Sequence, residues 1–426
     1  MREVPWGFNI FGYVTGTFGQ AWVTRTLMRV MDARDVPMCY RDMSVYDSRA
    51  TTDPEYPDRE CRGREMPYAV NLFSANPPAC MLRMCIQWAT LRPEKRFNAI
   101  LPFWELPVLP EDWKRGLRMM DVVLAPSEFI AQTIAAEAPE VPIIRFPQAV
   151  FLPDDIAADR GRWGFAPDSV VFLCAFDVTS DIERKNPWGA IEAFERAFEP
   201  DSGPQLVIKL NSRDAGPEHQ PLLNRLRDLV SRRADVSIIE EQLPYRGLLE
   251  LYASCDALIS LHRAEGLGLV LMEAMSLGKP VICTGWSGNM DFTSEENSCL
   301  VPYTLVPVTA THDAYRSEGF SRQPEWAEPD VDAAADWMRR LSEEPELRAS
   351  LGERAAREMR IVRAQYEAAE SLDKLKTFYE QRQRWEPAHA ARAAAIRSTR
   401  RSGWAKLARR VPRAVWARAW KAVQRA

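Results

Sequence analysis

Two glutamates, Glu265 and Glu273, lie eight positions apart in the segment SLHRAEGLGLVLMEAMSLGKPVI. Carboxylates are strong acceptors for hydroxyl groups, which sugars and ribose present in pairs. Gly266 and Gly268 lie between the two acids and allow a ligand to approach the backbone closely. A single glutamate of this kind would be interpreted as a solvated loop residue, whereas the pair with its glycines predicts a ligand site.

The elements expected around this segment place both glutamates at one edge of a parallel sheet. A strand at 257–261 is followed by a short polar loop and by a helix from about residue 268 to residue 277. Gly278 is expected to end the helix in a left-handed conformation. Open α/β sheets bind ligands at the carboxyl ends of their strands, and a helix N-terminus there suits a phosphate. Glu265 is thus predicted in the loop and Glu273 in the helix.

The segment resembles the E-x7-E motif of retaining GT-B glycosyltransferases, in particular family 4. The resemblance continues through residues 284–303 and covers roughly residues 7–385 of the chain. It implies a nucleotide-diphosphate sugar as donor and transfer with retention of the anomeric configuration. In such enzymes the departing phosphate takes the acceptor proton, so no dedicated protein base is expected.

The same resemblance assigns roles to individual residues. It implies that Glu273 binds the ribose hydroxyls of the donor and that Glu265 binds hydroxyls of the transferred sugar. Further donor contacts are implied for Gly266, Leu267, Gly268, Gly288 and Asn289.

Arg184 and Lys185 are the expected partners of the donor diphosphate and, with Glu265, the predicted catalytic set. A leaving diphosphate needs a metal or basic groups, and because the sequence shows no convincing metal-ligand cluster, no metal is expected. Lys185 matches the lysine with which the resembling family holds the diphosphate, whereas Asn186 replaces that family's next glycine and Arg184 substitutes for an arginine further upstream. The alternative is a solvated basic pair. Lys209, in the strand LVIKLN, is a second donor-binding candidate that could instead reach solvent.

The segment IFGYVTGTFGQAWVTRTL predicts a strand, a glycine-bearing turn and a helix near the N-terminus. Gly12, Gly16 and Gly19 loosely resemble the loop that closes over the donor phosphates in GT-B enzymes, with Gly16 as the expected contact. A dinucleotide-binding Rossmann site is disfavoured because the GxGxxG spacing and the following acidic residue are missing. Thr15 and Thr17 are candidates for contacts with ligand hydroxyls.

Trp104 and Glu105 stand where members of the resembling family often carry a His-Asp pair that contacts the sugar. Both are candidate sugar or acceptor contacts, although Glu105 could instead cap a helix that begins near Pro110. His262, three residues before Glu265, is a further candidate for the sugar site with an equally plausible structural role.

Short β-rich runs such as VVLAPS, VVFLCAF and KPVICTG are each followed by a helical pattern, which predicts parallel sheets covered on both faces. The expected fold class is α/β, specifically GT-B, with two Rossmann-like parallel-sheet domains facing across a cleft and helices at the C-terminus. The predicted units are a first, acceptor-side domain at 1–155, a second, donor-side domain at 165–365, a helix at 366–386 that crosses back to the first domain, and a basic amphipathic tail at 388–426.

Three further features of the sequence bear on metal binding, redox state and location. The DVD sequence at 330–332 mimics a metal-binding motif, but Asp330 as the N-cap of a helix is the favoured interpretation. The eight cysteines form no CxxC pair and lie mostly in apolar context, which predicts reduced, buried thiols in a cytoplasmic protein. No apolar run is long enough to span a membrane, and the N-terminus lacks the pattern of a secretion signal.

The C-terminal tail is strongly basic, unlike the acidic remainder of the chain. Residues 387–426 contain eleven Lys and Arg and no acids, so the formal net charge of −4 divides into −15 for the rest of the chain and +11 here. Tryptophan and aliphatic residues at helical intervals, with cations on the other face, predict binding to an anionic membrane surface. Contact with the acidic body or another protein is the main alternative, and no specific nucleic acid is expected.

These features together predict a retaining, metal-independent hexosyltransferase without a cofactor. We expect it to transfer mannose or a similar hexose from a GDP- or UDP-linked donor to a saccharide or lipid-linked acceptor in cell-envelope glycan or glycolipid synthesis. The expected location is the cytoplasm, with peripheral contact to the inner face of the cytoplasmic membrane. The alternatives are a nucleotide-sugar epimerase of GT-B fold and a non-catalytic saccharide-binding relative.

Overall fold

The computed structural model describes residues 4–44, 52, 54–61, 66–77, 80, 96–213, 215–309, 315 and 319–381. The predicted membrane-binding tail at 388–426 lies outside these residues and stays a prediction.

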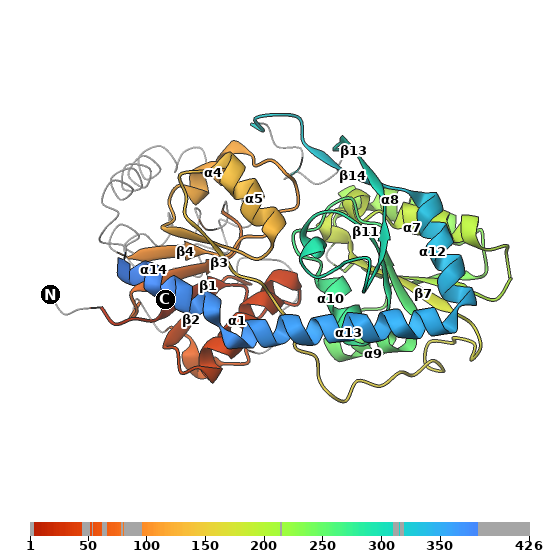
Figure 1. The fold of residues 1–426 in the computed structure, drawn as a ribbon, viewed down its shortest axis with the longest axis horizontal. Helices are drawn as coiled ribbons and strands as arrows, with labels where there is room; N and C mark the ends of the chain where they lie inside the picture. Colours follow the sequence, from red (N-terminus) through yellow and green to blue (C-terminus); the bar gives the residue numbers. More distant parts are fainter. Residues whose placement is uncertain are drawn as a thin grey trace.

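The first half of the chain forms a six-stranded parallel sheet in the order β2-β1-β3-β4-β5-β6 (Figure 1). Its strands are β1 (Phe8–Gly12), β2 (Met38–Asp42), β3 (Val70–Ser74), β4 (Phe97–Ile100), β5 (Val122–Ala125) and β6 (Ile143–Arg145). Its helices include α1 (Gly19–Ala33), α4 (Glu111–Leu117) and α5 (Glu128–Glu137). Alternate strand residues face opposite sides: Phe11 packs in the core beneath α4 and α5, whereas Ile10 packs in the core beneath α1.

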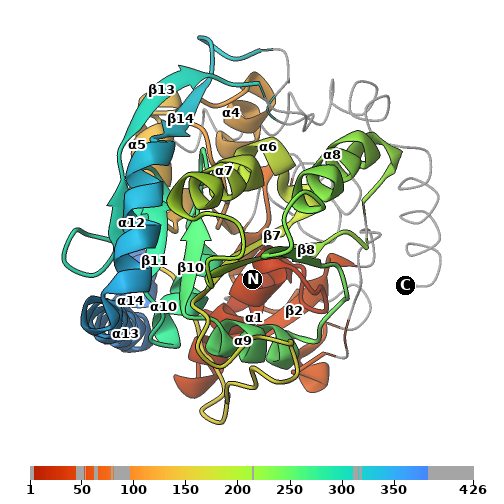
Figure 2. The same cartoon turned by 90° about the vertical axis from the view of Figure 1, so that its right-hand side faces the viewer.

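The second half repeats this plan with the strand order β12-β11-β10-β7-β8-β9, again all parallel. Its strands are β7 (Val171–Asp177), β8 (Gln205–Asn211), β9 (Val236–Ile239), β10 (Ala257–Ser260), β11 (Val281–Thr284) and β12 (Cys299–Val301). One face is covered by α7 (Pro187–Ala197), α8 (Gln220–Val230) and α12 (Val331–Glu343), and the other by α9 (Tyr245–Ser254), α10 (Leu269–Ser276) and α13 (Pro345–Ala368) (Figure 2). The short helix α6 (Ile182–Lys185) follows β7.

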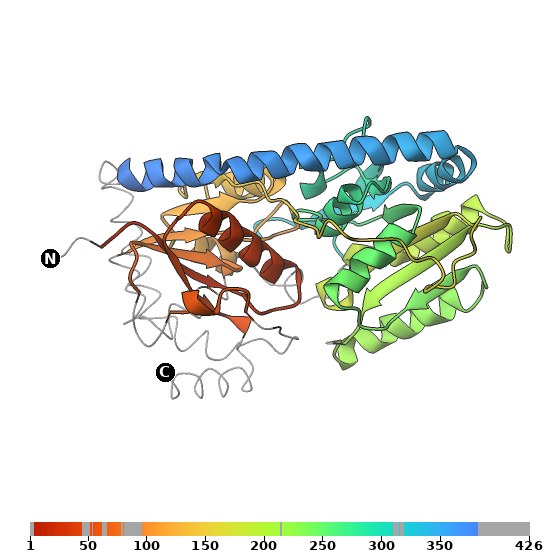
Figure 3. The ribbon, with the colours of Figure 1, turned by 90° about the horizontal axis from the view of Figure 1, so that it is seen from below.

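Two long C-terminal helices join the domains along one side of the molecule (Figure 3). The helix α13 packs Ala355 and Met359 into the core of the second domain. Its last turns and α14 (Glu370–Gln381) place Tyr366 and Leu372 in the core of the first. The expected crossing helix is therefore present, although the crossing begins within α13. The exact domain boundaries stay predictions.

A second connection, which the sequence did not suggest, lies on the opposite side of the molecule from α13 (Figure 1). The strands β13 (Tyr303–Pro307) and β14 (Glu325–Pro329) form an antiparallel hairpin beside the second sheet. Between them, the Gly319 carbonyl accepts a hydrogen bond from the Glu111 amide at 3.1 Å, and Arg322 donates to the Pro107 carbonyl at 2.8 Å. The hairpin thus attaches the second domain to the first.

The structure corrects the cysteine prediction at one place. Cys39 on β2 and Cys61 form a disulfide with a Cα–Cα distance of 5.5 Å. The two meet because the Cys61 amide bonds to the Tyr40 carbonyl at the edge of β2, a contact that their sequence separation of 22 does not reveal. The other five described cysteines are free and buried, as expected.

Two further expectations can be compared with the fold. Asp330 caps α12 by accepting hydrogen bonds from the amides of Asp332 and Ala333, so the N-cap interpretation of DVD is confirmed. Within the described ranges, no helix combines the length and the apolar character needed to cross a membrane.

Candidate active site

The two segments with the predicted catalytic residues follow neighbouring strands. Arg184 and Lys185 end α6, shortly after β7, and Glu265 lies in the loop after β10. The strands β7 and β10 pair in parallel, and the strand order reverses its direction between them. Such a topological switch point leaves a crevice at the carboxyl ends of the strands, which is where this class of sheet binds ligands.

Glu265 and the two basic residues form one buried charge cluster. The Nζ of Lys185 forms an ion pair with Glu265 Oε1, and Arg184 Nη1 lies 3.4 Å from the same oxygen. The side chain of Glu265 is 12% exposed and that of Arg184 only 4%. Burial alone would raise the pKa of Glu265, but the charges of Lys185 and Arg184 outweigh it and lower the pKa to about 2. The carboxyl is therefore ionised throughout the physiological range.

Backbone carbonyls hold Arg184 in place. Its guanidinium donates to the carbonyl of Ala264 at 2.7 Å and to the carbonyl of Ser180 at 2.9 and 3.1 Å. Burial acts to lower its pKa, but the Tyr315 and Glu265 side chains outweigh that effect and raise it. Arg184 therefore fixes the α6 turn against the Glu265 loop, and Lys185, 14% exposed, is the more accessible of the two basic groups.

Residues that follow β11 form hydrogen bonds to the loop that carries Glu265. Ser287 Oγ accepts a hydrogen bond from the Glu265 amide at 2.9 Å, and the Gly288 amide donates a hydrogen bond to the Glu265 carbonyl at 2.8 Å. A side chain at Gly288 would begin 2.3 Å from the Gly266 carbonyl oxygen, so only glycine admits this contact. Gly288 thus supports the Glu265 loop.

His262 and Asn289 lie beneath the same loop and have no exposed surface. His262 Nε2 and Asn289 Oδ1 are 3.1 Å apart, and Asn289 donates to the Thr284 carbonyl at 3.1 Å. Burial lowers the pKa of His262. Both groups therefore hold the loop in place, and their predicted ligand contacts stay predictions.

Glu273 lies inside α10, as expected, and is 6% exposed. Gly268 begins the helix with φ 97°, a left-handed conformation that favours glycine, and Leu267 is buried in the core of the second domain. Tyr245, the first residue of α9, donates its hydroxyl hydrogen to Glu273 Oε1 at 2.9 Å. Burial raises the pKa of Glu273 to about 7, despite the opposing effect of that hydrogen bond.

The first domain meets this site through its glycine loop. The predicted strand, turn and helix are confirmed, and α1 begins at Gly19, where a Cβ would lie 3.2 Å from Leu269 at the start of α10. The Thr15 hydroxyl is bonded to Asp42, and the Gly16 carbonyl accepts from Arg25 at 2.8 Å. Thr17 lies in the same loop.

Trp104 and Glu105 occupy different environments. The Trp104 side chain is 2% exposed, packs in the core of the first domain and donates to the Val108 carbonyl at 2.9 Å, so it is a core residue in this structure. Glu105 accepts a hydrogen bond from the Tyr315 hydroxyl at 2.8 Å. The alternative helix-capping role of Glu105 is wrong, because the N-cap of α4 is Pro110 and receives no side-chain hydrogen bond.

Lys209 lies on β8 and is 5% exposed. It therefore does not reach solvent, which was the alternative to donor binding. Its Nζ donates to the Leu210 carbonyl at 2.7 Å, and burial lowers its pKa.

Sequence reasoning missed several residues of the site. Ser127, the N-cap of α5, donates from its hydroxyl to the Gly266 carbonyl at 2.7 Å and so joins the first domain to the Glu265 loop. Tyr245, Ser287 and Tyr315 were also not identified. A serine before the helical pattern EFIAQTIAAE indicated the cap, but nothing in the sequence indicated its partner across the cleft.

In the part of the chain that the structure describes, no three His, Cys, Asp or Glu side chains are arranged to hold a metal ion. The expectation of a metal-independent site stays a prediction.

Comparison with known proteins agrees with this architecture. The sequence model of the family described as Glycosyl transferases group 1 matches residues 175–304, which include Lys185, Glu265 and Glu273. The structure is similar to that of sucrose-phosphate synthase from Thermosynechococcus elongatus, with a TM-score of 0.64 and 14% identity over 88% of this chain and 98% of that protein.

Two further solved structures share the fold. Anabaena HepE in complex with UDP and glucose has a TM-score of 0.55 and 14% identity, covering 88% of this chain and 100% of that one. The UDP-forming trehalose-phosphate synthase from Burkholderia xenovorans in complex with glucose-6-phosphate has a TM-score of 0.51 and 13% identity, covering 72% of each chain. The predicted fold class is thus confirmed: the chain has the α/β GT-B fold of glycosyltransferases, and its second domain carries the match to glycosyl transferases of group 1.

Proposed function

We propose that the protein is a retaining, metal-independent glycosyltransferase of the family 4 type, which transfers a hexose from a nucleotide-diphosphate sugar. The observation that carries this proposal is the convergence of Lys185 and Glu265 at the switch point of the second sheet, with Glu273 on the adjoining helix. A basic group, an ionised acceptor and a second buried carboxyl match the diphosphate, the hexose and the ribose of such a donor.

The residues divide the work between them. Lys185 neutralises the leaving diphosphate, and Arg184 positions the loop of Glu265, which accepts hydroxyls of the hexose. The bond between the anomeric carbon and the phosphate oxygen breaks, a bond to the acceptor oxygen forms on the same face, and the acceptor proton passes to the departing phosphate. The protein contributes orientation, charge stabilisation and exclusion of water.

The donor we propose is a UDP-linked hexose, with GDP-mannose as the alternative. The support is indirect: HepE was solved with UDP and glucose, and the Burkholderia synthase is described as UDP-forming. For the acceptor we propose a saccharide or a lipid-linked saccharide of the cell envelope, reached at the inner membrane surface through the tail at 388–426. A sugar phosphate is the second acceptor class to test, because one neighbour holds glucose-6-phosphate.

Calorimetric titration with UDP and GDP tests the donor site directly. We expect one nucleotide to bind, Glu273→Ala to abolish that binding, and the exposed Glu296→Ala, which removes a similar acid away from the site, to leave it unchanged. A protein that binds neither nucleotide, or a Glu273→Ala variant that binds like the wild type, would contradict the proposal.

Activity then separates the remaining alternatives. Release of UDP or GDP that requires an acceptor and persists in EDTA indicates metal-independent transfer, and the anomeric coupling in the product NMR spectrum reports retention or inversion. Conversion of the donor sugar without an acceptor would indicate an epimerase. Saccharide binding without nucleotide binding would indicate a non-catalytic relative.

A further inference from the structure

The carboxyl of Glu273 is held by one side chain from a neighbouring helix. Glu273 on α10 is 6% exposed, and the Tyr245 hydroxyl at the start of α9 donates to its Oε1 at 2.9 Å. Within the described part of the chain, this is the only hydrogen bond that the carboxyl accepts. A glutamate side chain has several rotamers, so the bond selects the direction in which the carboxyl oxygens face. A carboxylate accepts more than one hydrogen bond, which leaves capacity for a ligand.

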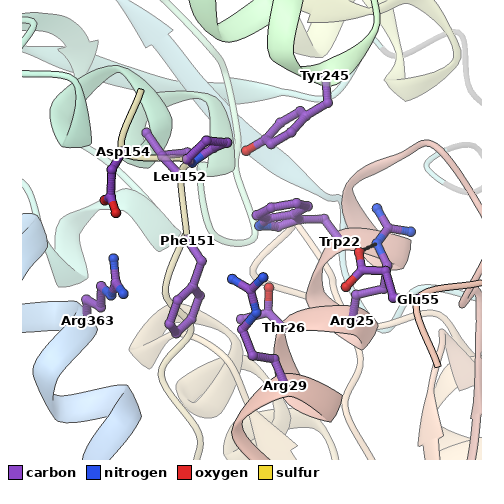
Figure 4. Close-up of a pocket in the computed structure, with 11 residues that line it drawn as sticks. Trp22, Arg25, Thr26, Arg29, Glu55, Phe151, Leu152, Asp154, Tyr245 and Arg363 are labelled. Atoms are coloured by element: carbon purple, nitrogen blue, oxygen red, sulfur yellow. Dashed lines mark ion pairs between the residues drawn. The ribbon is translucent and has the colours of Figure 1, made fainter. Parts of the chain in front are cut away.

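Tyr245 is in turn held by a residue of the other domain. Trp22 lies on α1 of the first domain, and its indole packs against the Tyr245 ring with 4.6 Å between the ring centroids (Figure 4). Both side chains line a cavity of about 480 Å³ at the boundary between the domains. Aromatic rings at this separation attract each other in preferred orientations, so Trp22 limits the positions that the phenol can take.

Arg25 connects Trp22 to the glycine loop of the first domain. Its guanidinium carbon lies 5.8 Å from the centroid of the Trp22 ring, and its Nη1 donates to the carbonyls of Val14 and Gly16 at 2.9 and 2.8 Å. A cation is attracted to the electron-rich face of an indole. The Nε1 of Trp22 has no hydrogen-bond partner among the residues that the structure describes, so ring contacts rather than a hydrogen bond fix the indole. The loop expected to face the donor phosphates is thus joined to the ring that holds Tyr245.

The hydroxyl of Tyr245 also favours the form of Glu273 that accepts hydrogen bonds. Burial raises the pKa of Glu273 to about 7, and the hydrogen bond from Tyr245 acts in the opposite direction because it stabilises the ionised form. An ionised carboxylate only accepts hydrogen bonds, whereas a protonated carboxyl uses one oxygen as a donor. The hydroxyls of a ribose can donate to the ionised form. Tyr245 therefore supports both the direction and the charge that ribose binding requires.

We propose that Tyr245 is a positioning residue for nucleotide recognition, which directs the Glu273 carboxylate towards the donor ribose and is itself held by Trp22 of the first domain. The inference rests on the proposed function, because it takes Glu273 as the group that binds the ribose hydroxyls. It gives the first domain a part in recognising a ribose that is bound by the second. Ribose recognition is then complete only when α1 and α9 are in contact, as they are in this structure.

Calorimetric titration of the full chain with UDP, 2′-deoxy-UDP and 3′-deoxy-UDP measures what each ribose hydroxyl contributes. The corresponding guanosine nucleotides are used if the protein binds GDP instead. For the wild type, we expect at least one deoxy nucleotide to bind roughly tenfold more weakly than its parent, as for the loss of a hydrogen bond to a charged group. Tyr245→Phe keeps the ring against Trp22 and removes only the hydroxyl. In this variant the ratio should fall to about twofold, because Glu273 no longer faces the ribose in a fixed direction.

Two changes at Trp22 test the contribution of the first domain. Trp22→Ala removes the ring that packs against Tyr245 and should lower the ratio in the same direction as Tyr245→Phe. Trp22→Phe keeps an aromatic ring at this position and should retain most of the wild-type ratio. General damage to the fold would weaken all three nucleotides by the same factor and leave the ratio unchanged.

The matched control is Tyr366→Phe, which removes a buried hydroxyl in the core of the first domain that has no hydrogen-bond partner among the described residues. It should bind all three nucleotides like the wild type, and melting temperatures confirm that each variant is folded. The proposal is overturned if Tyr245→Phe keeps the wild-type ratio or weakens all three nucleotides equally. An unchanged ratio in Trp22→Ala would overturn the part assigned to the first domain.

Failure of this inference can be distinguished from failure of the proposed function. A wild-type protein that binds no nucleotide would refute both. If Glu273→Ala loses UDP binding while Tyr245→Phe keeps the wild-type ratio, the donor site stands and only the role of Tyr245 is refuted.

Discussion

The two glutamates should change stability in opposite directions when each is replaced by glutamine. Burial raises the pKa of Glu273 from its ordinary value of 4.5 to about 7. Below pH 4.5 the group is protonated in both states, and between pH 4.5 and 7 the unfolded chain loses the proton first. The free energy of unfolding therefore falls across this window by about 3 kcal/mol and is constant above it. Glu273→Gln should match the wild type near pH 4.5 and exceed it by about 3 kcal/mol at pH 8.

Glu265 has the reverse sign. Lys185 and Arg184 lower its pKa from 4.5 to about 2, so the stability from its ionised form is present above pH 4.5 and is lost as the pH falls toward 2. Glu265→Gln leaves two basic groups buried without their carboxylate, which should cost about 3 kcal/mol at pH 8.

Thermal unfolding at pH 5 and pH 8 measures both effects. For a domain of this size, about 3 kcal/mol corresponds to roughly 6–12 °C, upward for Glu273→Gln and downward for Glu265→Gln at pH 8. Tyr245 can still donate to the amide oxygen of the new glutamine, so the replacement leaves the hydrogen bond in place. If Glu273→Gln melts below the wild type at pH 8, or both variants shift the same way, the assignment of a raised pKa to Glu273 is wrong.

Three further outcomes are expected. Lys185→Ala should lower kcat of the proposed transfer by roughly 10²–10³-fold with little change in fold, because it removes the charge proposed to meet the leaving diphosphate; rates of nucleotide release measure this. Tyr315→Phe removes the hydroxyl that donates to Glu105 and should lower the free energy of unfolding by about 1–3 kcal/mol, as read from denaturant titration. Thiol titration in denaturant without reductant should find six of the eight cysteines, because Cys39 and Cys61 are bonded to each other; a count of eight would contradict the disulfide.

The part of the site that could be predicted from sequence is the part fixed by strand topology. Lys185 and Glu265 are eighty positions apart in the chain, but each follows a strand, and β7 and β10 are neighbours in the sheet. The motif around Glu273 likewise predicted a loop, a helix and a glycine stop, and α10 with Gly278 at φ 72° agrees. Parallel strands bring their carboxyl ends to one edge, so the order of elements alone determines which loops meet.

Side-chain direction could not be predicted in the same way. His262, Asn289 and Trp104 lie beside the predicted ligand loops in sequence, yet each points into the interior and binds backbone there. A polar group next to a binding loop can satisfy either the ligand or the loop itself, and only the packing decides. The hairpin of β13 and β14 was not predicted either. The side chains of Tyr303–Pro307 are largely exposed, so the sequence there shows no alternating apolar pattern.

The contacts between the domains bear on how a donor enters. Ser127 of the first domain donates a hydrogen bond to the Gly266 carbonyl. The Glu128 amide donates to the carboxylate of Asp291 in the second domain at 3.0 Å, and Arg145 forms an ion pair with the same carboxylate. Apolar contacts accompany these bonds: Phe129 packs against Trp286 at a ring-centroid distance of 5.2 Å, and Ala264 and Trp326 of the second domain pack in the core of the first. The helices α13 and α14 also insert apolar side chains into the cores of both domains. Opening by separation of the first domain from the Glu265 loop would therefore break these apolar contacts as well as the hydrogen bonds, and would leave the helical connection intact. The hairpin contacts at Pro107 and Glu111 lie on the opposite side from that connection, so the same movement must break them too.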